Sequence, residues 1–284
     1  MSTASPNPMT YRDLLRCPTC GSAVWDDPLR CIACNEQWLR DGAVLFAPDA
    51  NADPAVAEER RGVRDTEHRP ELGGIEAEFE SLGTASGELR EMILALPGRT
   101  NSPVFDQPGY FKNVHQHETA FLFLKSHLAV RRGDVLLDLG ADLTWSTQHF
   151  ARCGARCVAL DINHHLAAGT LFMEAFDVSY LLLNADMHLP IFQPESFDVI
   201  LACSALHHCR NLPALLSYLH SLLRPGGRIG WLEPYCLFEE DKSQFGKDQI
   251  DQGINENVYT LDEWHRHALA AGFLLDRFLL TDSF

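Results

Sequence analysis

The stretch Val135-Leu136-Leu137-Asp138-Leu139-Gly140 decides the fold of this chain. A short apolar run that ends in an acidic residue and a glycine turn predicts a buried strand followed by a helix. In a doubly wound parallel sheet, a nucleoside cofactor binds where such a strand meets its turn. At two later positions where glycine is usual, the chain has Asp142 and Thr144. This departure leaves open whether the turn admits a cofactor.

Strands and helices alternate along the rest of the chain. Further strands are predicted over 157–160, 180–183, 197–202, 228–232 and 273–280. Helices are predicted over 112–128, 144–153 and 261–271, and from a cap at Asn211 to a stop at Pro225. This alternation predicts an α/β fold with a doubly wound, mostly parallel sheet and right-handed crossovers.

Acidic residues end two of the later strands. Asp161 lies 21 positions after Gly140 (161 − 140), a distance that suits a carboxylate accepting both hydroxyls of a ribose. Taken alone, an Asp at a strand end has no special role. After the turn at Asp138 and Gly140, the cofactor role is the better interpretation.

Four cysteines near the N-terminus form two C-x-x-C pairs, Cys17/Cys20 and Cys31/Cys34. Two such pairs complete a tetrahedral sulfur shell that suits Zn²⁺ and leaves no position open, so the predicted site is structural. Two disulfides or an iron centre are the alternatives. Residues 37–46 read as a hairpin with an Asp41-Gly42 turn.

Composition limits the class of protein. The chain has 23 basic and 39 acidic residues and a net charge of −16, which argues against a nucleic acid as its main substrate. Its nine cysteines are an odd number, no apolar run is long enough to cross a membrane, and the N-terminus lacks the features of a signal peptide. We therefore expect reduced thiols and a cytoplasmic protein.

Changes in composition suggest four regions. We expect a disordered lead-in over 1–10, a zinc ribbon over 11–48, a linker with covering helices over 49–108, and a large domain over 109–284. Within the linker, 76–82 and 87–96 are predicted as short helices. The composition favours a solvated connector, and the alternative is a lid over the active site.

The large domain resembles the class I S-adenosylmethionine-dependent methyltransferases. The resemblance rests on motifs in the family's order and spacing over residues 110–280: Asp138-Leu139-Gly140-Ala141, Asp161, residues 184–190, Ser196-Phe197-Asp198, Ala205-Leu206-His207-His208 and Leu223-Arg224-Pro225-Gly226-Gly227. The block 14–46 resembles a small zinc-ribbon protein that activates several tRNA and protein methyltransferases. The resemblance implies a methyltransferase with a Rossmann-like sheet, S-adenosyl-L-methionine as cofactor and Zn²⁺ in the ribbon.

The resemblance also implies roles for individual residues. Asp138 and Gly140 would lie beside the methionine part of the cofactor, Asp161 would bind its ribose, and Asp186 would accept from its adenine. The full implied set is Asp138, Gly140, Ala141, Asp142, Asp161, Ile162, Asp186, Met187 and Ser204. The Asp142 carboxylate could bind the cofactor's ammonium, exclude the cofactor, or point away.

Methyl transfer requires an aligned acceptor and often a base. The candidates follow the fourth and fifth strands or come from the covering segment: His207, His208, Glu233, Tyr110 and His117. We expect His207 to be the base, although one ring of such a pair often only packs. Residues 255–259 are predicted as a loop over the pocket, or as an Asn-rich turn and cap.

Three functions are compatible with these features. The first is methyl transfer to a small molecule, such as a natural product, a sugar or a lipid precursor. The second is RNA methylation, because rRNA guanine methyltransferases with a four-cysteine zinc site are similar. The third is a non-catalytic binding or scaffold protein. The antiparallel pair that commonly ends the family's sheet is also missing, so we expect a protein partner or a second copy at the sheet edge or at the ribbon.

Overall fold

The computed structural model describes residues 8–26, 29–48, 54, 56–58, 60–61, 87–244, 250 and 254–280. Most of the predicted lead-in and the predicted helix over 76–82 lie outside these residues. Within the described part of the chain, no helix is both long and apolar enough to span a membrane.

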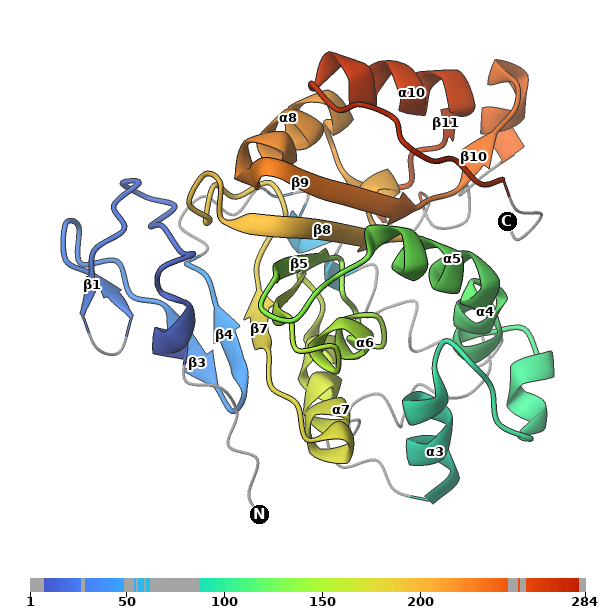
Figure 1. Cartoon of the computed structure of the whole chain (residues 1–284), viewed down its shortest axis with the longest axis horizontal. Helices are drawn as coiled ribbons and strands as arrows, with labels where there is room; N and C mark the ends of the chain where they lie inside the picture. The colour runs from blue at the N-terminus through green and yellow to red at the C-terminus, as the bar shows by residue number, and fades with distance from the viewer. Residues whose placement is uncertain are drawn as a thin grey trace.

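A seven-stranded sheet runs through the molecule in the order β3-β4-β7-β6-β5-β8-β9 (Figure 1). All neighbouring strands are parallel except the antiparallel pair β3–β4. The strands are β3 (Leu39–Asp41), β4 (Val44–Phe46), β5 (Val135–Leu139), β6 (Arg156–Asp161), β7 (Leu181–Asn184), β8 (Phe197–Cys203) and β9 (Leu223–Leu232). This arrangement confirms the predicted α/β fold.

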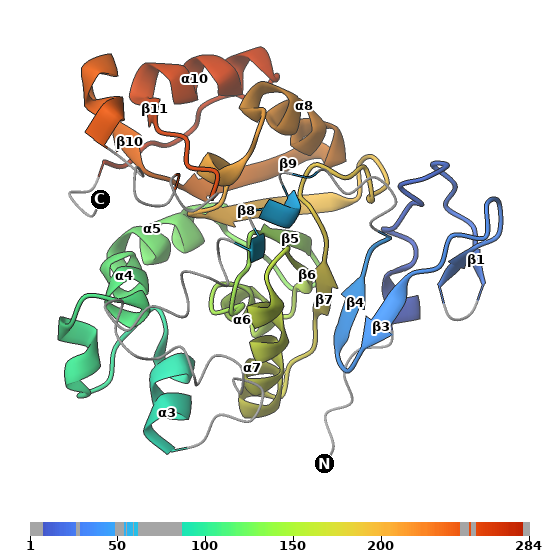
Figure 2. The same cartoon turned by 180° about the vertical axis from the view of Figure 1, so that it is seen from behind.

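Helices cover both faces of the sheet, as the front and back views show (Figures 1 and 2). One face packs against α3 (Gly87–Ala95), α4 (Tyr110–Gln116), α5 (Glu118–Leu128), α6 (Thr147–Ala151) and α7 (Gly169–Phe176). The other face packs against α8 (Leu212–Leu222), α10 (Leu261–Ala270) and the four-cysteine segment. Two apolar cores result, one on each side of the sheet.

Short elements complete the chain. They are η1 (Pro8–Tyr11), β1 (Trp25–Asp26), β2 (Arg30–Cys31), η4 (Pro103–Asp106), η5 (His164–Ala168), η6 (Leu206–His208), β10 (Tyr235–Cys236), η7 (Glu239–Gln244) and β11 (Tyr259–Thr260). The pair β10–β11 is parallel and lies outside the main sheet.

The four-cysteine segment is joined to the sheet by backbone pairing. Strand β4 pairs with β7, so the hairpin predicted around Asp41-Gly42 extends the sheet at that edge. Earlier in the segment, Leu15 forms an isolated antiparallel β-bridge with Phe192, and the N–H of Arg16 donates to the carbonyl of Ile191 at 2.8 Å. The segment's apolar side chains belong to the same core as α8 and the sheet.

Three predicted elements are wrong in extent or type. The predicted helix 112–128 breaks at His117 into α4 and α5. The predicted helix 144–153 shrinks to α6, because Thr144 has a φ of +66°, which no right-handed helix accepts. Residues 273–280 form no strand. Their apolar side chains form two runs of three around Asp276-Arg277, which a strand could bury only with both faces covered, and Leu274 is 91% exposed.

Candidate functional site

The turn after β5 requires a glycine at position 140. Gly140 has a φ of +69°, and a Cβ there would lie 2.3 Å from the Cβ of Ala205. The N–H groups of Gly140 and Ala141 both donate to the carbonyl of Leu160 in β6. The turn is therefore held tightly between the ends of β6 and β8, and a side chain at this position would displace it.

The residues at the two later turn positions keep a left-handed backbone without being glycines. Asp142 has a φ of +45° and Thr144 a φ of +66°. Asp tolerates this region, whereas a β-branched residue there is strained. Thr144 is fully buried, and its hydroxyl is hydrogen bonded to that of Tyr180 at 2.8 Å. The packing around Thr144 thus stabilises a conformation that a threonine avoids elsewhere.

The Asp142 carboxylate binds other side chains of the protein. It accepts a short hydrogen bond from the Tyr110 hydroxyl, and its other oxygen lies 3.2 Å from His165 Nδ1. Burial alone would raise the pKa of Asp142, but the bonds from His165 and Tyr110 outweigh it and lower the pKa. Burial and the Asp142 charge raise the pKa of Tyr110 well above its usual value. These contacts anchor the start of α4 to the turn.

Asp138 is a buried carboxylate with one unused oxygen. Its Oδ2 accepts from Ser146 Oγ and Thr147 Oγ1, each at 2.6 Å. Its Oδ1 has no hydrogen-bond partner among the described residues. Burial raises the pKa of Asp138 to about 6, although the two hydroxyls act in the opposite direction. An unpaired buried acceptor is costly, which makes Asp138 Oδ1 a candidate acceptor for a donor from a ligand.

Asp161 ends β6 beside this turn. Its Oδ2 accepts from the N–H of Asp142 at 2.8 Å, and its Oδ1 accepts from the N–H of Asn163 at 2.7 Å. Burial, followed by the charge of Asp142, raises the pKa of Asp161 to about 6. Each carboxylate oxygen can accept a second hydrogen bond, so both remain able to receive a hydroxyl. The next residue, Ile162, is half-buried.

Asp186, after β7, is engaged in an ion pair. Its two oxygens lie 2.8 Å from His188 Nδ1 and 2.8 Å from Arg210 Nη2. Although burial opposes it, the hydrogen bonds from His188 and Arg210 hold the pKa of Asp186 well below its usual value. The predicted contact of Asp186 with an adenine stays a prediction, as does that of the partly buried Met187.

The ends of β8 and β9 carry the second group of polar side chains. Glu233 accepts from the backbone N–H groups of Ala205 at 2.9 Å, Leu206 at 2.8 Å and His207 at 3.3 Å. Its Oε2 also lies 2.6 Å from His207 Nδ1. The side chain of Glu233 is almost fully buried. Glu233 therefore fixes the turn after β8 and orients the His207 ring, with Nε2 facing away from it.

A loop from the C-terminal part of the chain closes over this turn. Asn257 donates through Nδ2 to the carbonyls of His207 and Cys209, each at 3.0 Å, and through its N–H to His207 at 2.9 Å. Asn255 Nδ2 donates to the His208 carbonyl at 2.6 Å. The polar density of residues 255–259 was the only sequence signal for this contact.

Between these asparagines, the loop presents Glu256, which was predicted only as part of the polar stretch 255–259 and without a role of its own. Its Oε2 lies 3.5 Å from His207 Nε2, and its Oε1 lies 3.6 Å from His208 Nδ1. Burial raises the pKa of Glu256. Burial and the neighbouring His207 lower the pKa of His208 to about 3, which makes its ring neutral at pH 7.

The remaining predicted residues lie around the two groups. Burial lowers the pKa of His117, and the opposing charges of Glu233 and His207 also act on it, so these three groups lie near one another. Tyr110 lies instead beside Asp142, on the other side of the site. Ser204, with a φ of +52°, follows β8, and its N–H donates to the carbonyl of Leu232 at 2.7 Å.

The four N-terminal cysteines come together away from these strand ends. Cys17 Sγ lies 3.6 Å from Cys34 Sγ, and Cys20 Sγ lies 3.5 Å from Cys31 Sγ. All four sulfurs lie within 4.8 Å of one another, and none forms a disulfide. A tetrahedron with Zn–S bonds of about 2.3 Å has sulfurs about 3.8 Å apart, so the donor set fits a zinc ion.

Comparisons with known proteins agree with this geometry. The sequence model of a family described as a methyltransferase domain matches residues 137–230, from β5 into β9. Demethylmenaquinone methyltransferase of Tropheryma whipplei is 32% identical over 152 residues, covering 52% of this chain and 59% of that protein. Malonyl-[acyl-carrier protein] O-methyltransferase of Yersinia pestis is 30% identical over 158 residues, covering 51% of this chain and 56% of that protein. The chain thus spans somewhat more than half the length of these curated relatives.

A crystal structure supports the fold. It is that of a Bacillus halodurans protein provisionally assigned as a methyltransferase, with a TM-score of 0.51 and 18% identity, covering 56% of this chain and 71% of that chain. The fold is that of the class I S-adenosylmethionine-dependent methyltransferases. Within it, residues 137–230 are the part of the chain that matches the methyltransferase-domain family.

Proposed function

We propose that this protein transfers a methyl group from S-adenosylmethionine to a small-molecule acceptor. The observation that carries the proposal is that two carboxylates, Asp138 and Asp161, lie beside the Gly140 turn. Among the described residues, the buried Asp138 Oδ1 has no hydrogen-bond partner. A cationic cofactor with an ammonium group and two ribose hydroxyls offers the donors that these carboxylates lack.

The residues present fit this cofactor. Asp138 and the Gly140 turn would hold its methionine part, Asp161 would accept from its ribose, and Ile162 would pack against its base. When bound, S-adenosylmethionine supplies an electrophilic methyl group on a sulfonium. Asp142 is not needed to hold it, because its carboxylate is already bonded to Tyr110 and His165.

On the acceptor side, His207 is proposed to help the acceptor lose its proton. Glu233 acts as a positioning residue, because it binds Nδ1 and three backbone N–H groups of the same turn. His117, His208 and Glu256 would border the acceptor from the α4–α5 junction, η6 and the loop. All three are partly buried, which lowers the local dielectric and strengthens hydrogen bonds and charge interactions in the site.

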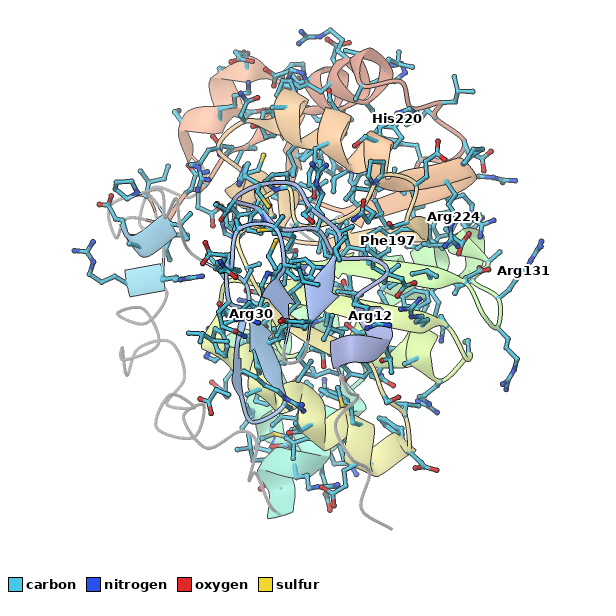
Figure 3. The ribbon with its side chains drawn as sticks, turned by 90° about the vertical axis from the view of Figure 1, so that its left-hand side faces the viewer. Arg12, Arg30, Arg131, Phe197, His220 and Arg224 are labelled. Carbon is cyan, nitrogen blue, oxygen red and sulfur yellow. The ribbon has the colours of Figure 1, made fainter. Side chains whose placement is uncertain are left out.

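A small acceptor is supported by charge and by the relatives. The chain's net charge is −16, and the names of two relatives describe methyl transfer to a demethylmenaquinone and to a malonyl group on a carrier protein. Figure 3 shows Arg12, Arg30, Arg131 and Arg224 on the face that includes the ribbon. Arg30 is paired with Asp26 and Arg224 with Asp198. These ion pairs neutralise part of the positive charge on this face, which makes it less suited to bind RNA phosphates.

The four-cysteine cluster is proposed to hold a structural Zn²⁺. Its four sulfurs lie within 4.8 Å of one another, and Cys17 and Cys31 are buried in the core that the segment shares with the sheet. The ribbon would therefore act as a permanent part of the fold at the β7 edge. A protein partner could still bind its outer face.

Calorimetric titration with S-adenosylmethionine tests the proposal. We expect micromolar binding to the zinc-loaded chain, followed by methyl transfer to some member of a panel of quinols, carboxylates and hydroxylated lipids. A folded chain that binds neither the cofactor nor S-adenosylhomocysteine would instead support the non-catalytic alternative.

A further inference from the structure

Two histidines and a carboxylate face one another at the acceptor end of the site. One atom from each of His207, His208 and Glu256 lies within 4.8 Å of the other two. The closest approach, from His207 Nε2 to Glu256 Oε2, is 3.5 Å. That distance is long for a hydrogen bond but normal for two ligands of one metal ion with bonds of about 2.1 Å.

We propose that His207, His208 and Glu256 form a second metal site, which binds a divalent first-row transition-metal ion. Two imidazoles and one carboxylate select such an ion over Mg²⁺ or Ca²⁺, which prefer oxygen ligands alone. Three protein ligands leave coordination positions open, unlike the closed four-cysteine cluster.

The surroundings are those of a built metal site. Glu233 Oε2 lies 2.6 Å from His207 Nδ1, which directs the opposite nitrogen toward Glu256, as a carboxylate behind a metal-bound histidine does. The Asn255 carbonyl lies 2.8 Å from His208 Nδ1 and also orients the second ring, so a metal ion would bind His208 through Nε2 or displace this contact. The contact with Glu233 leaves Nε2 as the His207 nitrogen that faces the proposed ion.

Charge balance supports the same conclusion. The side chains of Glu233 and Glu256 are 1% and 9% exposed, and both lie against His207. Two buried carboxylates around one imidazole leave negative charge that a bound cation would neutralise.

The loop that carries Glu256 is held in place independently of any ion. Asn255 and Asn257 bind the carbonyls of residues 207–209, so Glu256 is delivered to the two histidines by a fixed backbone. Such preorganisation reduces the entropy that a metal ion must overcome to bind.

The role of the ion rests on the proposed methyl transfer. An acceptor oxygen coordinated at the open position would have a lowered pKa, because the metal stabilises its deprotonated form. With Nε2 on the ion and Nδ1 held by Glu233, His207 would not take the acceptor's proton itself, and the ion would replace it in promoting deprotonation. Binding of the ion itself does not depend on methyl transfer and can be measured separately.

Cobalt titration of a chain that holds one Zn²⁺, the equivalent bound by the cysteine cluster, is the decisive experiment. Co²⁺ bound by cysteines gives strong thiolate charge-transfer absorption in the near ultraviolet, whereas Co²⁺ bound by nitrogen and oxygen gives only weak visible bands. We expect one Co²⁺ per chain with visible bands alone, and no comparable binding of Mg²⁺. Glu256→Gln should lower the Co²⁺ affinity by more than about 10-fold. The matched control Glu240→Gln, on an exposed carboxylate, should leave it unchanged.

Cofactor titration of the same samples separates the two proposals. Glu256→Gln should keep the wild-type affinity for S-adenosylmethionine, which also shows that the variant is folded. A wild-type chain that binds S-adenosylmethionine but no Co²⁺ outside the cysteine cluster would overturn the metal site, as would equal Co²⁺ binding by wild type and Glu256→Gln. A chain that binds Co²⁺ but not S-adenosylmethionine would contradict the methyl transfer and leave the metal site standing.

Discussion

The two halves of the site are built differently. The cofactor half lies at the ends of β5 and β6. Asp138 accepts from two hydroxyls that follow it in its own turn, and Asp161 accepts from the N–H of Asn163 in its own turn. One donor to Asp161, the N–H of Asp142, comes from the neighbouring turn. In the acceptor half, His207, Glu233 and Glu256 come from η6, the end of β9 and a loop about 50 residues away from η6. The cofactor half is therefore set by local sequence, and the acceptor half by tertiary contacts.

The ribbon stands on the cofactor side of this division. Strand β4 pairs with β7, which itself pairs with β6. Strand β9, at the opposite edge, pairs only with β8 among the described strands of this sheet. A change in the ribbon should therefore alter cofactor binding more than metal binding in the acceptor half.

Loss of the ribbon metal should have the largest effect. Cys34→Ser removes one of the four proposed ligands, and we expect the whole chain to lose several kcal/mol of stability, because the cysteine segment shares its core with the sheet. Thermal unfolding with elemental analysis measures this effect. The matched control is Cys153→Ser, at an exposed cysteine outside the cluster. An unchanged melting temperature in a zinc-free variant would show that the ribbon folds without metal.

Asp161→Ala should give the next largest effect, confined to the cofactor half. Two charge-assisted hydrogen bonds to the ribose would be lost, which corresponds to about 3 kcal/mol, or roughly 100-fold in the affinity for S-adenosylmethionine. Calorimetry checks the affinity, and the exposed Asp276→Ala serves as control. Cobalt binding in the acceptor half should not change. Unaltered cofactor affinity would remove Asp161 from the site.

The contrast between the halves explains what the sequence predicted. The sequence predicts the Gly140 turn and the two acidic residues Asp138 and Asp161, because their hydrogen-bond partners lie in the same strand and turn or in the adjacent ones. Glu256 was not predicted, since its partners His207 and His208 are brought to it only by folding. The Asp142 contacts to Tyr110 and His165 also escaped prediction, because both partners lie more than 20 residues away. The failed strand at 273–280 shows that a continuous apolar run forms a strand only where both of its faces are buried, as they are in β5 and are not here.

Asp138→Asn should stabilise the protein while weakening the cofactor half. Burial raises the pKa of Asp138 to about 6, so the folded chain holds a proton that the unfolded chain releases near pH 4. The ionised form thus costs stability at pH 7, and we expect Asp138→Asn to raise the free energy of unfolding by roughly 2 kcal/mol there. The gain should shrink as the pH falls from 6 and vanish below about pH 4. Denaturant unfolding at several pH values measures it.

The same raised pKa values predict how cofactor binding depends on pH. Asp138 and Asp161 both have a pKa of about 6, so both become neutral as the pH falls below that value. The affinity for a cationic cofactor should then decrease between pH 7 and pH 5, with proton release on binding at pH 6. In Asp138→Asn the decrease should be shallower. A pH-independent affinity would mean that neither carboxylate contacts the cofactor.

Asp142→Gly should have the smallest effect, and it tests the departure from the usual glycine turn. Glycine fits the φ of +45° without strain, but the change removes the carboxylate that Tyr110 and His165 bind. Because these bonds anchor α4 over the cofactor half, we expect the cofactor affinity to fall by about 3- to 10-fold. Tyr110→Phe breaks one of the same bonds without touching the turn, so it should produce part of the same loss. An affinity that rises in Asp142→Gly and stays constant in Tyr110→Phe would mean that the carboxylate repels the cofactor, and the cofactor half would then be impaired by its own turn.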